Sequence, residues 1–157
     1  MDMIPGRTTR LRLTASRAGT YRGQCAEYCG GPHALMAFTV IAEEPDAHAA
    51  WLDRQSKPAQ APAGENERNG ASLFIAAGCG ACHTVDGTKA GGTIGPNLTH
   101  LASRQSIGVD QNRVSHDNIV RFLTAGQTIK PYNHMPEFGF LRPHERDAIA
   151  SYLLSLR

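Results

Sequence analysis

Cys79-Gly80-Ala81-Cys82-His83 is the stretch that decides the fold of the second half of this 157-residue chain. Two thiols stand about one helical turn apart and an imidazole follows at once, which is the pattern that attaches haem covalently through its two vinyl groups. The same residues could instead form half of a zinc site, a redox dithiol or a structural disulfide. The motif alone leaves these alternatives open.

Residues downstream of the motif favour haem over zinc. No cysteine follows Cys82, whereas a zinc site would need further Cys or His ligands at short spacing. A six-coordinate electron-transfer haem needs a ligand on its far face, and a thioether suits that role. Met135 is the only methionine in this half of the chain, in a loop that Pro131 and Pro136 would stiffen. His134 is the rival ligand, and a bis-His haem would have a lower reduction potential.

A second cluster of metal-ligand residues lies in the segment 25–36. It contains two cysteines, a histidine and a methionine, namely Cys25, Cys29, His33 and Met36. Thiolate and thioether ligands together with imidazole favour copper over zinc or magnesium, and two thiolates four residues apart can bridge a pair of metal ions. The alternative is a Cys25–Cys29 disulfide in an exported domain, with Met36 in the core beside the next strand. Spacing alone does not decide between them.

The first 45 residues have the pattern of β-structure. Polar and apolar residues alternate over Arg10–Ala15, which predicts a strand with one buried face. A turn is expected at Arg17–Thr20, extended chain at Thr20–Cys25, and a further strand at Ala34–Ile41 after a Gly-Gly-Pro loop.

The rest of the chain has a helical pattern. A helix is predicted at Asp46–Gln55, and the Pro- and Ala-rich stretch Ser56–Glu65 reads as a linker. Beyond it, apolar residues recur at helical spacing in three segments, Asn69–Ala77, a helix from His116 with a stop at Gly126, and Pro143–Leu156.

Composition excludes some classes of protein. The net charge is only +2 and the basic residues are dispersed, so we do not expect nucleic-acid binding. No stretch approaches the roughly 20 apolar residues of a spanning helix. The first residues lack the basic and apolar regions of a signal peptide, and we expect that Met1 is not the start of a natural mature protein.

The order of motifs over residues 67–157 resembles a class I cytochrome c. That resemblance implies haem c bound through Cys79 and Cys82, with His83 as the proximal iron ligand and Met135 as the distal one. It also implies that the Pro96 carbonyl accepts a hydrogen bond from the His83 ring and so fixes its tautomer. The other histidines of this half are expected at the surface or at helix caps: His100, His116 and His144.

The segment from Gly23 to Met36 resembles the binuclear copper (CuA) loop of cytochrome c oxidase subunit II. The resemblance implies that Cys25 and Cys29 bridge two coppers, that His33 and Met36 each bind one, and that Glu27 contributes its backbone carbonyl. Residues 3–7 and 19–21 also match the cupredoxin strands of that family. Nitrous oxide reductase has a similar loop, but a fused cytochrome c fits the oxidase better.

One departure from the family pattern concerns the copper ligands. The family uses a second histidine from an upstream strand, and no histidine precedes Cys25 here. The two transmembrane helices of subunit II are absent as well. We therefore expect an excised fragment or a truncated reading frame, a copper centre that lacks one ligand in this chain, and exposed edges on a partial β-barrel.

These inferences give one interpretation of the whole chain, a partial all-β cupredoxin-like segment followed by an all-α class I cytochrome c domain. The expected parts are a copper-loop segment at 1–45, a helix and Pro/Ala linker at 46–66, and a cytochrome c domain at 67–157. The resemblance implies the C-terminal portion of subunit II of a caa-type oxidase, with electrons passing from a donor through haem c to copper.

The expected partners are the oxidase catalytic subunit and an electron donor, either a cytochrome c or a quinol-oxidising complex. The expected location is the outer face of the bacterial cytoplasmic membrane, with membrane contact only through the absent helices. No residue is expected to perform acid–base or nucleophilic chemistry. The alternatives are a stand-alone soluble c-type cytochrome with a non-functional copper segment, and an exported binding module in which both Cys pairs are disulfides.

Overall fold

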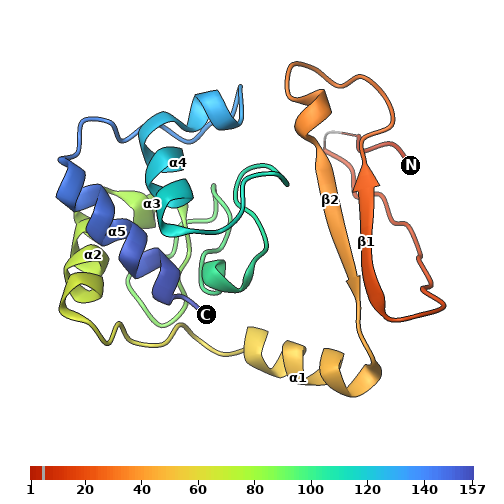
Figure 1. Ribbon diagram of the computed structural model, residues 1–157, viewed down its shortest axis with the longest axis horizontal. Helices are drawn as coiled ribbons and strands as arrows, with labels where there is room; N and C mark the ends of the chain where they lie inside the picture. Colours follow the sequence, from red (N-terminus) through yellow and green to blue (C-terminus); the bar gives the residue numbers. More distant parts are fainter. Residues whose placement is uncertain (5) are drawn as a thin grey trace.

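The computed structural model describes residues 1–4 and 6–157 and has two parts, a β-hairpin and a helical part (Figure 1). In the hairpin, β1 (Gly19–Gln24) pairs antiparallel with β2 (Ala37–Ala42), from Gly19 opposite Ala42 to Gln24 opposite Ala37. The expected extended chain before Cys25 is therefore confirmed. The second strand begins three residues later than predicted, because a 3₁₀ turn occupies His33–Leu35.

The predicted strand at Arg10–Ala15 is wrong, since these residues have no regular structure and are exposed. Its apolar side chains, Leu11 and Leu13, are 62% and 65% exposed. An alternating pattern forms a strand only where a neighbouring strand and a core accept its apolar face. No strand forms at the described residues of segment 3–7 either, and Pro5 of that predicted cupredoxin match lies outside the described residues.

The hairpin is a fragment of a β architecture rather than a closed one. Tyr21, Phe38 and Ile41 on its strands are 44%, 54% and 52% exposed. Phe38 lies directly over Gly23 on the facing strand, where an added Cβ would come within 2.1 Å of the ring. Within the described residues, two strands make up the whole sheet, so apolar side chains that a sandwich would bury stay exposed.

The hairpin is joined to the helical part by α1 (Pro45–Gln55) and the linker after it. The linker backbone makes two contacts with the helical part. Ala59 N–H donates to the Asp86 carbonyl at 3.0 Å, and the Lys57 carbonyl lies 3.0 Å from the His100 Nε2. The stretch predicted as a linker is therefore held along part of its length.

The helical part is built on the crossing of α2 (Glu65–Ala76) and α5 (Pro143–Ser155). Gly70 lies at the crossing, where an added Cβ would come within 1.9 Å of the Ala148 carbonyl oxygen. Phe74 and Tyr152 meet edge-to-face with ring centroids 5.7 Å apart. The core around them contains the most deeply buried large side chains of the described residues, Phe74, Val85, Ile149 and Leu156.

Two helix boundaries differ from the sequence-based expectation. The first is the start of α2, which begins at Glu65 rather than Asn69, because the Glu67 carboxylate accepts hydrogen bonds from the Gly64 and Ala63 amides and so caps the helix. The short helix α3 (Cys79–Cys82) follows α2.

The second boundary concerns α4 (His116–Ile129), which runs past the predicted stop at Gly126. The stop appears instead as a break, where Ala125 leaves helical geometry (φ −147°, ψ 54°). The Leu123 carbonyl accepts from the Phe138 N–H at 2.7 Å, and the Gln127 N–H donates to the Glu137 carboxylate at 3.1 Å. The segment after the Met135 loop thus replaces hydrogen bonds that the break removes.

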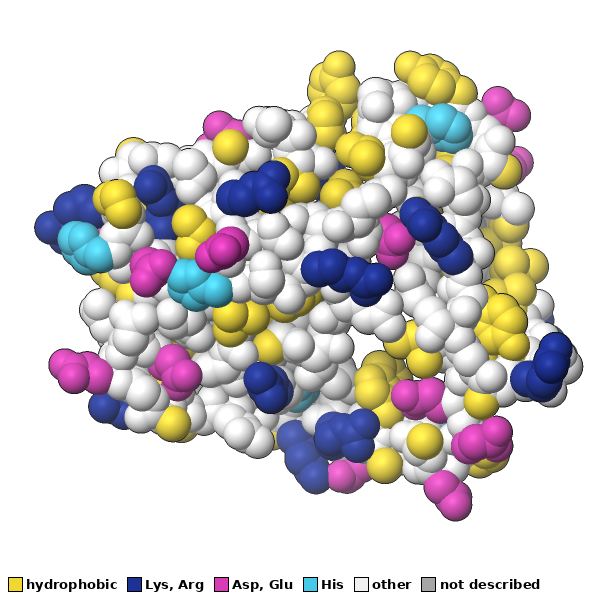
Figure 2. Space-filling model, viewed as in Figure 1, with side chains coloured by type: hydrophobic (Ala, Val, Ile, Leu, Met, Phe, Trp, Pro, Cys, Tyr) yellow, Lys and Arg dark blue, Asp and Glu magenta, His cyan; other side chains and the backbone are white. Residues whose placement is uncertain are grey.

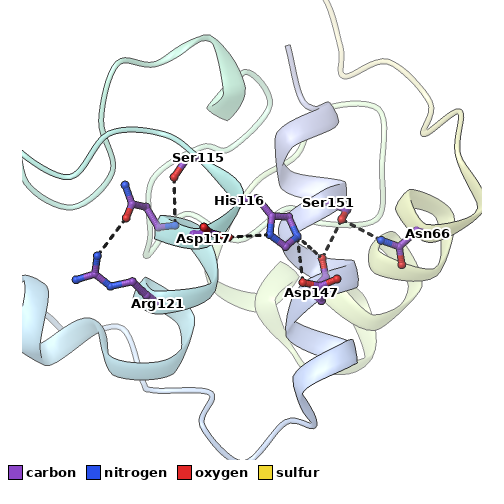
Figure 3. Close-up of polar contacts among 8 residues, drawn as sticks. Asn66, Ser115, His116, Asp117, Arg121, Asp147 and Ser151 are labelled. Atoms are coloured by element: carbon purple, nitrogen blue, oxygen red, sulfur yellow. Dashed lines mark hydrogen bonds and ion pairs between the residues drawn. The ribbon is translucent and has the colours of Figure 1, made fainter.

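A polar network ties α4 and α2 to α5 (Figure 3). The His116 Nε2 lies 3.2 Å from the Asp147 carbonyl oxygen and 3.3 Å from its carboxylate. Ser151 donates to the same carbonyl at 3.0 Å and accepts from Asn66 at 2.9 Å. His116 therefore bridges two helices, while the Ser115 hydroxyl caps α4 by accepting from the Asn118 amide.

Among the helices of residues 1–4 and 6–157, none is long and apolar enough to span a bilayer.

Candidate functional site

The Cys79–His83 motif lies on one wall of a cavity of about 560 Å³ in the helical part. Gly78, with a left-handed φ of 81°, ends α2 and turns the chain into α3. The short helix ends when the His83 N–H donates to the Cys79 carbonyl at 3.0 Å. Cys79, Cys82 and His83 all line the cavity, as the covalent attachment of a single flat cofactor requires.

The orientation of the His83 ring is set by the loop that follows α3. The His83 Nδ1 lies 2.7 Å from the Pro96 carbonyl oxygen. A carbonyl can only accept, so Nδ1 carries the proton and Nε2 is left as the free nitrogen. Gly95 packs against the ring edge, since an added Cβ would come within 2.4 Å of its Cε1. Any side chain at position 95 would push the imidazole out of place.

The opposite wall of the cavity is the loop that contains Met135. The Met135 N–H donates to the Asn133 side-chain oxygen at 2.9 Å. The side-chain amide of Asn133 donates in turn to the Lys130 carbonyl at 2.7 Å. The Gln127 side-chain amide donates to the Asn133 backbone carbonyl at 2.7 Å. His134 also lines the cavity but is exposed, while Met135 is half-buried and packs against the core.

Asn133 is a residue that the sequence analysis missed. An Asn two positions before the predicted ligand is a signal for a side-chain-to-backbone turn, and it could have been recognised. The bond from the Met135 amide fixes the backbone from which the thioether projects.

Most of the cavity wall is apolar, with polar side chains such as Arg104, Ser106 and Lys130 along part of it. Its walls include the core side chains Phe74, Leu98, Ile119, Leu123 and Phe138. Burial, with a smaller contribution from the neighbouring Cys82, raises the pKa of Cys79 to about 11. A flat apolar cofactor with two sulfur attachment points, an imidazole on one face and a thioether on the other fits this set of donors. The structure thus brings together all five residues predicted for haem.

The second cluster lies in the loop between β1 and β2. The Cys25 N–H donates to the Met36 carbonyl at 3.2 Å and closes the loop at the end of the hairpin. The Cys29 Sγ lies 3.5 Å from the Cys25 Sγ, 3.6 Å from the His33 Nδ1 and 3.0 Å from the Met36 Sδ. Four soft donor atoms therefore converge on one small volume, as copper requires.

The backbone carbonyl of Glu27 also faces this cluster, 3.3 Å from the Cys25 Sγ. All four cysteines are free, so neither pair forms the disulfide of the binding-module alternative. The hydrogen bond with Cys25, more than any other cause, raises the pKa of the exposed Cys29 thiol. A metal ion must displace these protons, so its affinity for the loop rises with pH.

The copper cluster contains a single histidine in the part of the chain that the structure describes. The one group of three or more close His, Cys or acidic ligands found there is Cys25, Cys29 and His33. Within residues 1–4 and 6–157, no second histidine belongs to this group. The thiolate pair fits copper, and the full set of binuclear ligands is not assembled from residues 1–4 and 6–157.

Two family models match the chain, one for each part. The model for cytochrome c matches residues 67–157. The model for the periplasmic domain of cytochrome c oxidase subunit II matches residues 1–43. The boundary between the matches falls in the segment that contains α1 and the linker.

Curated relatives match across both parts. The cytochrome c oxidase subunit 2 of Alkalihalophilus pseudofirmus is 34% identical over 158 residues, covering 100% of this chain and 45% of the relative. The subunit 2 of Bacillus sp. strain PS3 is 28% identical and covers 93% of this chain and 42% of the relative. In Cereibacter sphaeroides the match is 45% identical but covers only 34% of this chain and 18% of the relative. The chain thus spans less than half of the length of each of these relatives.

Proposed function

This chain belongs to the cytochrome c family, with part of a cytochrome c oxidase subunit II periplasmic domain before its cytochrome, and from that premise we propose that it transfers electrons from haem c to copper within an oxidase that reduces oxygen. The observation that carries the proposal is the placement of Cys79, Cys82, His83 and Met135 around one apolar cavity. A family match alone would support the fold, whereas these side chains supply the chemistry.

On the haem side, the two thiols would form thioether bonds, with His83 Nε2 and Met135 Sδ as the axial ligands. Haem would supply a reversible one-electron Fe(III)/Fe(II) couple. The Pro96 carbonyl, which accepts from His83 Nδ1, keeps Nε2 unprotonated and makes it a stronger ligand. The largely apolar walls would limit the access of water to the haem and would favour the iron state of lower charge, which would raise the potential.

On the copper side, Cys25 and Cys29 would bridge two coppers, His33 and Met36 would each bind one, and the Glu27 carbonyl would complete the set. The 3.5 Å between the two Sγ atoms supports a shared pair of thiolates. No histidine precedes Cys25, so the second imidazole would have to be supplied from outside these 157 residues. The protein's contribution at both sites is to position and tune the metals.

The setting of this relay is part of the proposal. We place the chain on the outer face of the bacterial cytoplasmic membrane, beside the oxidase catalytic subunit, with a cytochrome c or a quinol-oxidising complex as donor. The proposed division is a copper-loop segment at 1–45, a helix and linker at 46–66 and the cytochrome c domain at 67–157. The periplasmic-domain match at residues 1–43 supports this location.

A stand-alone c-type cytochrome carrier is the second candidate. The observation that favours it is the single histidine of the copper cluster. In that case the haem site would work as proposed, while the loop would hold no binuclear centre.

The test is to produce the chain in cells that attach haem c and to analyse it for iron and copper. The proposed function requires a haem stain that survives denaturing electrophoresis, and the absorption band typical of thioether-ligated ferric haem. Cys82→Ala should weaken the stain, and Met135→Ala should abolish that band while the stain stays. Two coppers per chain with a purple colour support the relay. Haem without copper supports the carrier, and the absence of covalent haem contradicts both.

A further inference from the structure

We infer that Asp110 and Tyr132 are positioning residues that dock the helical part onto the hairpin and bring the Met135 loop to the copper loop. This inference rests on the proposed function, because it concerns how the two metal sites of one chain are held relative to each other. The linker limits how far apart the two parts can move, but a linker alone sets no orientation. Direct contacts between the two parts do set their relative orientation.

The first contact is made by the Asp110 carboxylate. One oxygen lies 3.4 Å from the Arg22 guanidinium and the other accepts from the Thr39 hydroxyl at 3.1 Å. Arg22 and Thr39 face each other across the hairpin, in register, so one carboxylate spans a single rung of the sheet. The Asp110 side chain is only 20% exposed, against 61% for Arg22, which makes it the better-ordered partner of the pair.

The second contact is made by Tyr132, three residues before Met135. Tyr132 is the only non-glycine residue with a positive φ, 63°, in the described part of the chain. Its ring is mostly exposed, but one edge rests on Gly31, where an added Cβ would come within 2.5 Å of the ring. Gly31 lies between the predicted ligands Cys29 and His33. A tyrosine with left-handed backbone geometry is unfavourable and is kept only where the surrounding structure stabilises it. The Tyr132–Gly31 contact is therefore of functional interest.

An opening between the two parts is visible in Figure 2, and Asp110 lies on the wall of the cavity there. A cavity of about 820 Å³ lies there, and Leu35 and Met36 of the copper loop line it. Four residues line both this cavity and the haem cavity, namely Arg104, Ser106, Gly108 and Lys130. The haem cavity therefore has one wall in common with the space next to the copper loop. Docking through Asp110 and Tyr132 would hold that wall beside the copper loop.

The test uses the full haem-loaded chain and measures position directly. Oxidised haem iron is paramagnetic and low-spin reduced haem is not, so the difference in amide chemical shifts between the two states reports the distance and direction of each hairpin residue from the iron. We expect sizeable shifts at residues 30–33. Asp110→Asn should lower the docking equilibrium constant about two- to five-fold, the range of partly exposed ion pairs, and shrink these shifts. Raised salt should do the same, because it screens the pair.

The controls separate docking from folding. Asp86→Asn removes an exposed carboxylate of the helical part and should leave the hairpin shifts unchanged. Exchanging the charges, Arg22→Asp with Asp110→Arg, should restore shifts that each single change reduces. Gly31→Ala should displace the Tyr132 ring and shrink the shifts, whereas Gly91→Ala, with nothing within 4 Å of the added Cβ, should not.

Two results would overturn the inference. One is a haem-loaded chain whose hairpin amides show no oxidation-dependent shift, and the other is an Asp110→Asn variant whose shifts equal those of the wild type. A chain that fails to attach haem contradicts the proposed function instead, so the two failures are distinguishable.

Discussion

The two metal-ligand clusters of this chain are held in opposite ways. The proposed haem ligands come from two segments that line a cavity walled by buried side chains, and Cys79 itself is 7% exposed. The copper ligands come from one loop at the end of a two-stranded sheet, where Cys29 is exposed. The first site is fixed by a core that forms within the described residues. The copper-loop site is held by local turns, on a hairpin whose large apolar side chains are exposed.

Matched phenylalanines should give the largest difference between the two parts. Phe74→Ala removes a 2%-exposed ring from the core and should cost about 3–5 kcal/mol, which threatens the folding of a part this small. Phe38→Ala on the half-exposed hairpin face should cost less than about 1 kcal/mol. Thermal unfolding followed by circular dichroism compares the two. Equal losses would contradict the division into a packed part and an open part.

Backbone contact should give the next largest effect. Gly70→Ala puts a methyl group against the Ala148 carbonyl at the crossing of α2 and α5, so the helices must separate. Overpacking of this kind costs about 1–3 kcal/mol, and contact with backbone places this site near the upper end. Gly91→Ala has open space and serves as the control. Chemical denaturation of both variants measures the two effects. An unchanged midpoint for Gly70→Ala would contradict the prediction, because it would show that α2 and α5 accommodate the methyl group without loss of stability.

A smaller effect is expected from the Met135 loop. Asn133→Ala removes the acceptor of the Met135 amide and the bond to the Lys130 carbonyl, each of which contributes about 1 kcal/mol. The loosened loop should weaken thioether ligation and give neighbouring His134 access to the iron. The change would appear as a weaker thioether band and a lower reduction potential. Asn69→Ala, on the exposed face of α2, should change neither.

The contrast between the parts also explains what could be predicted from sequence. The Cys79–His83 motif is contiguous and Met135 has one rival in its loop, so the motif and the family resemblance together name the proposed haem ligands, which line one cavity. The segment 25–36 was found for the same reason. Arg10–Ala15 was predicted as a strand and is not one, because an alternating pattern does not reveal whether a partner surface exists.

Long-range contacts could not be predicted in this way. Asp110 meets Thr39 across 71 positions of sequence, and neither residue stands in a recognisable motif. The same holds for Gly70, whose importance depends on which helix crosses it. The early start of α2 is different, because the Glu67 cap is a local signal that could have been used.

The smallest expected effect is a pH dependence of the stability of the helical part. The Arg142 guanidinium and amide, which donate to the Glu145 carboxylate at the start of α5, lower the pKa of Glu145 from 4.5 to about 2. A carboxyl group whose pKa falls on folding stabilises the protein above its unfolded value and loses that contribution as the pH falls from about 4.5 to about 2. Glu145→Gln should therefore lower the melting temperature at neutral pH.

The difference between wild type and Glu145→Gln should shrink through that window and vanish below it. Melting curves of both proteins across this pH range give the measurement. Glu43→Gln, at an exposed position just after the hairpin, should show no such window. A Glu145→Gln deficit that persisted unchanged into strong acid would mean that the side chain acts by packing rather than by charge. The start of α5 would then be held by packing, like the rest of the core, rather than by its ion pair.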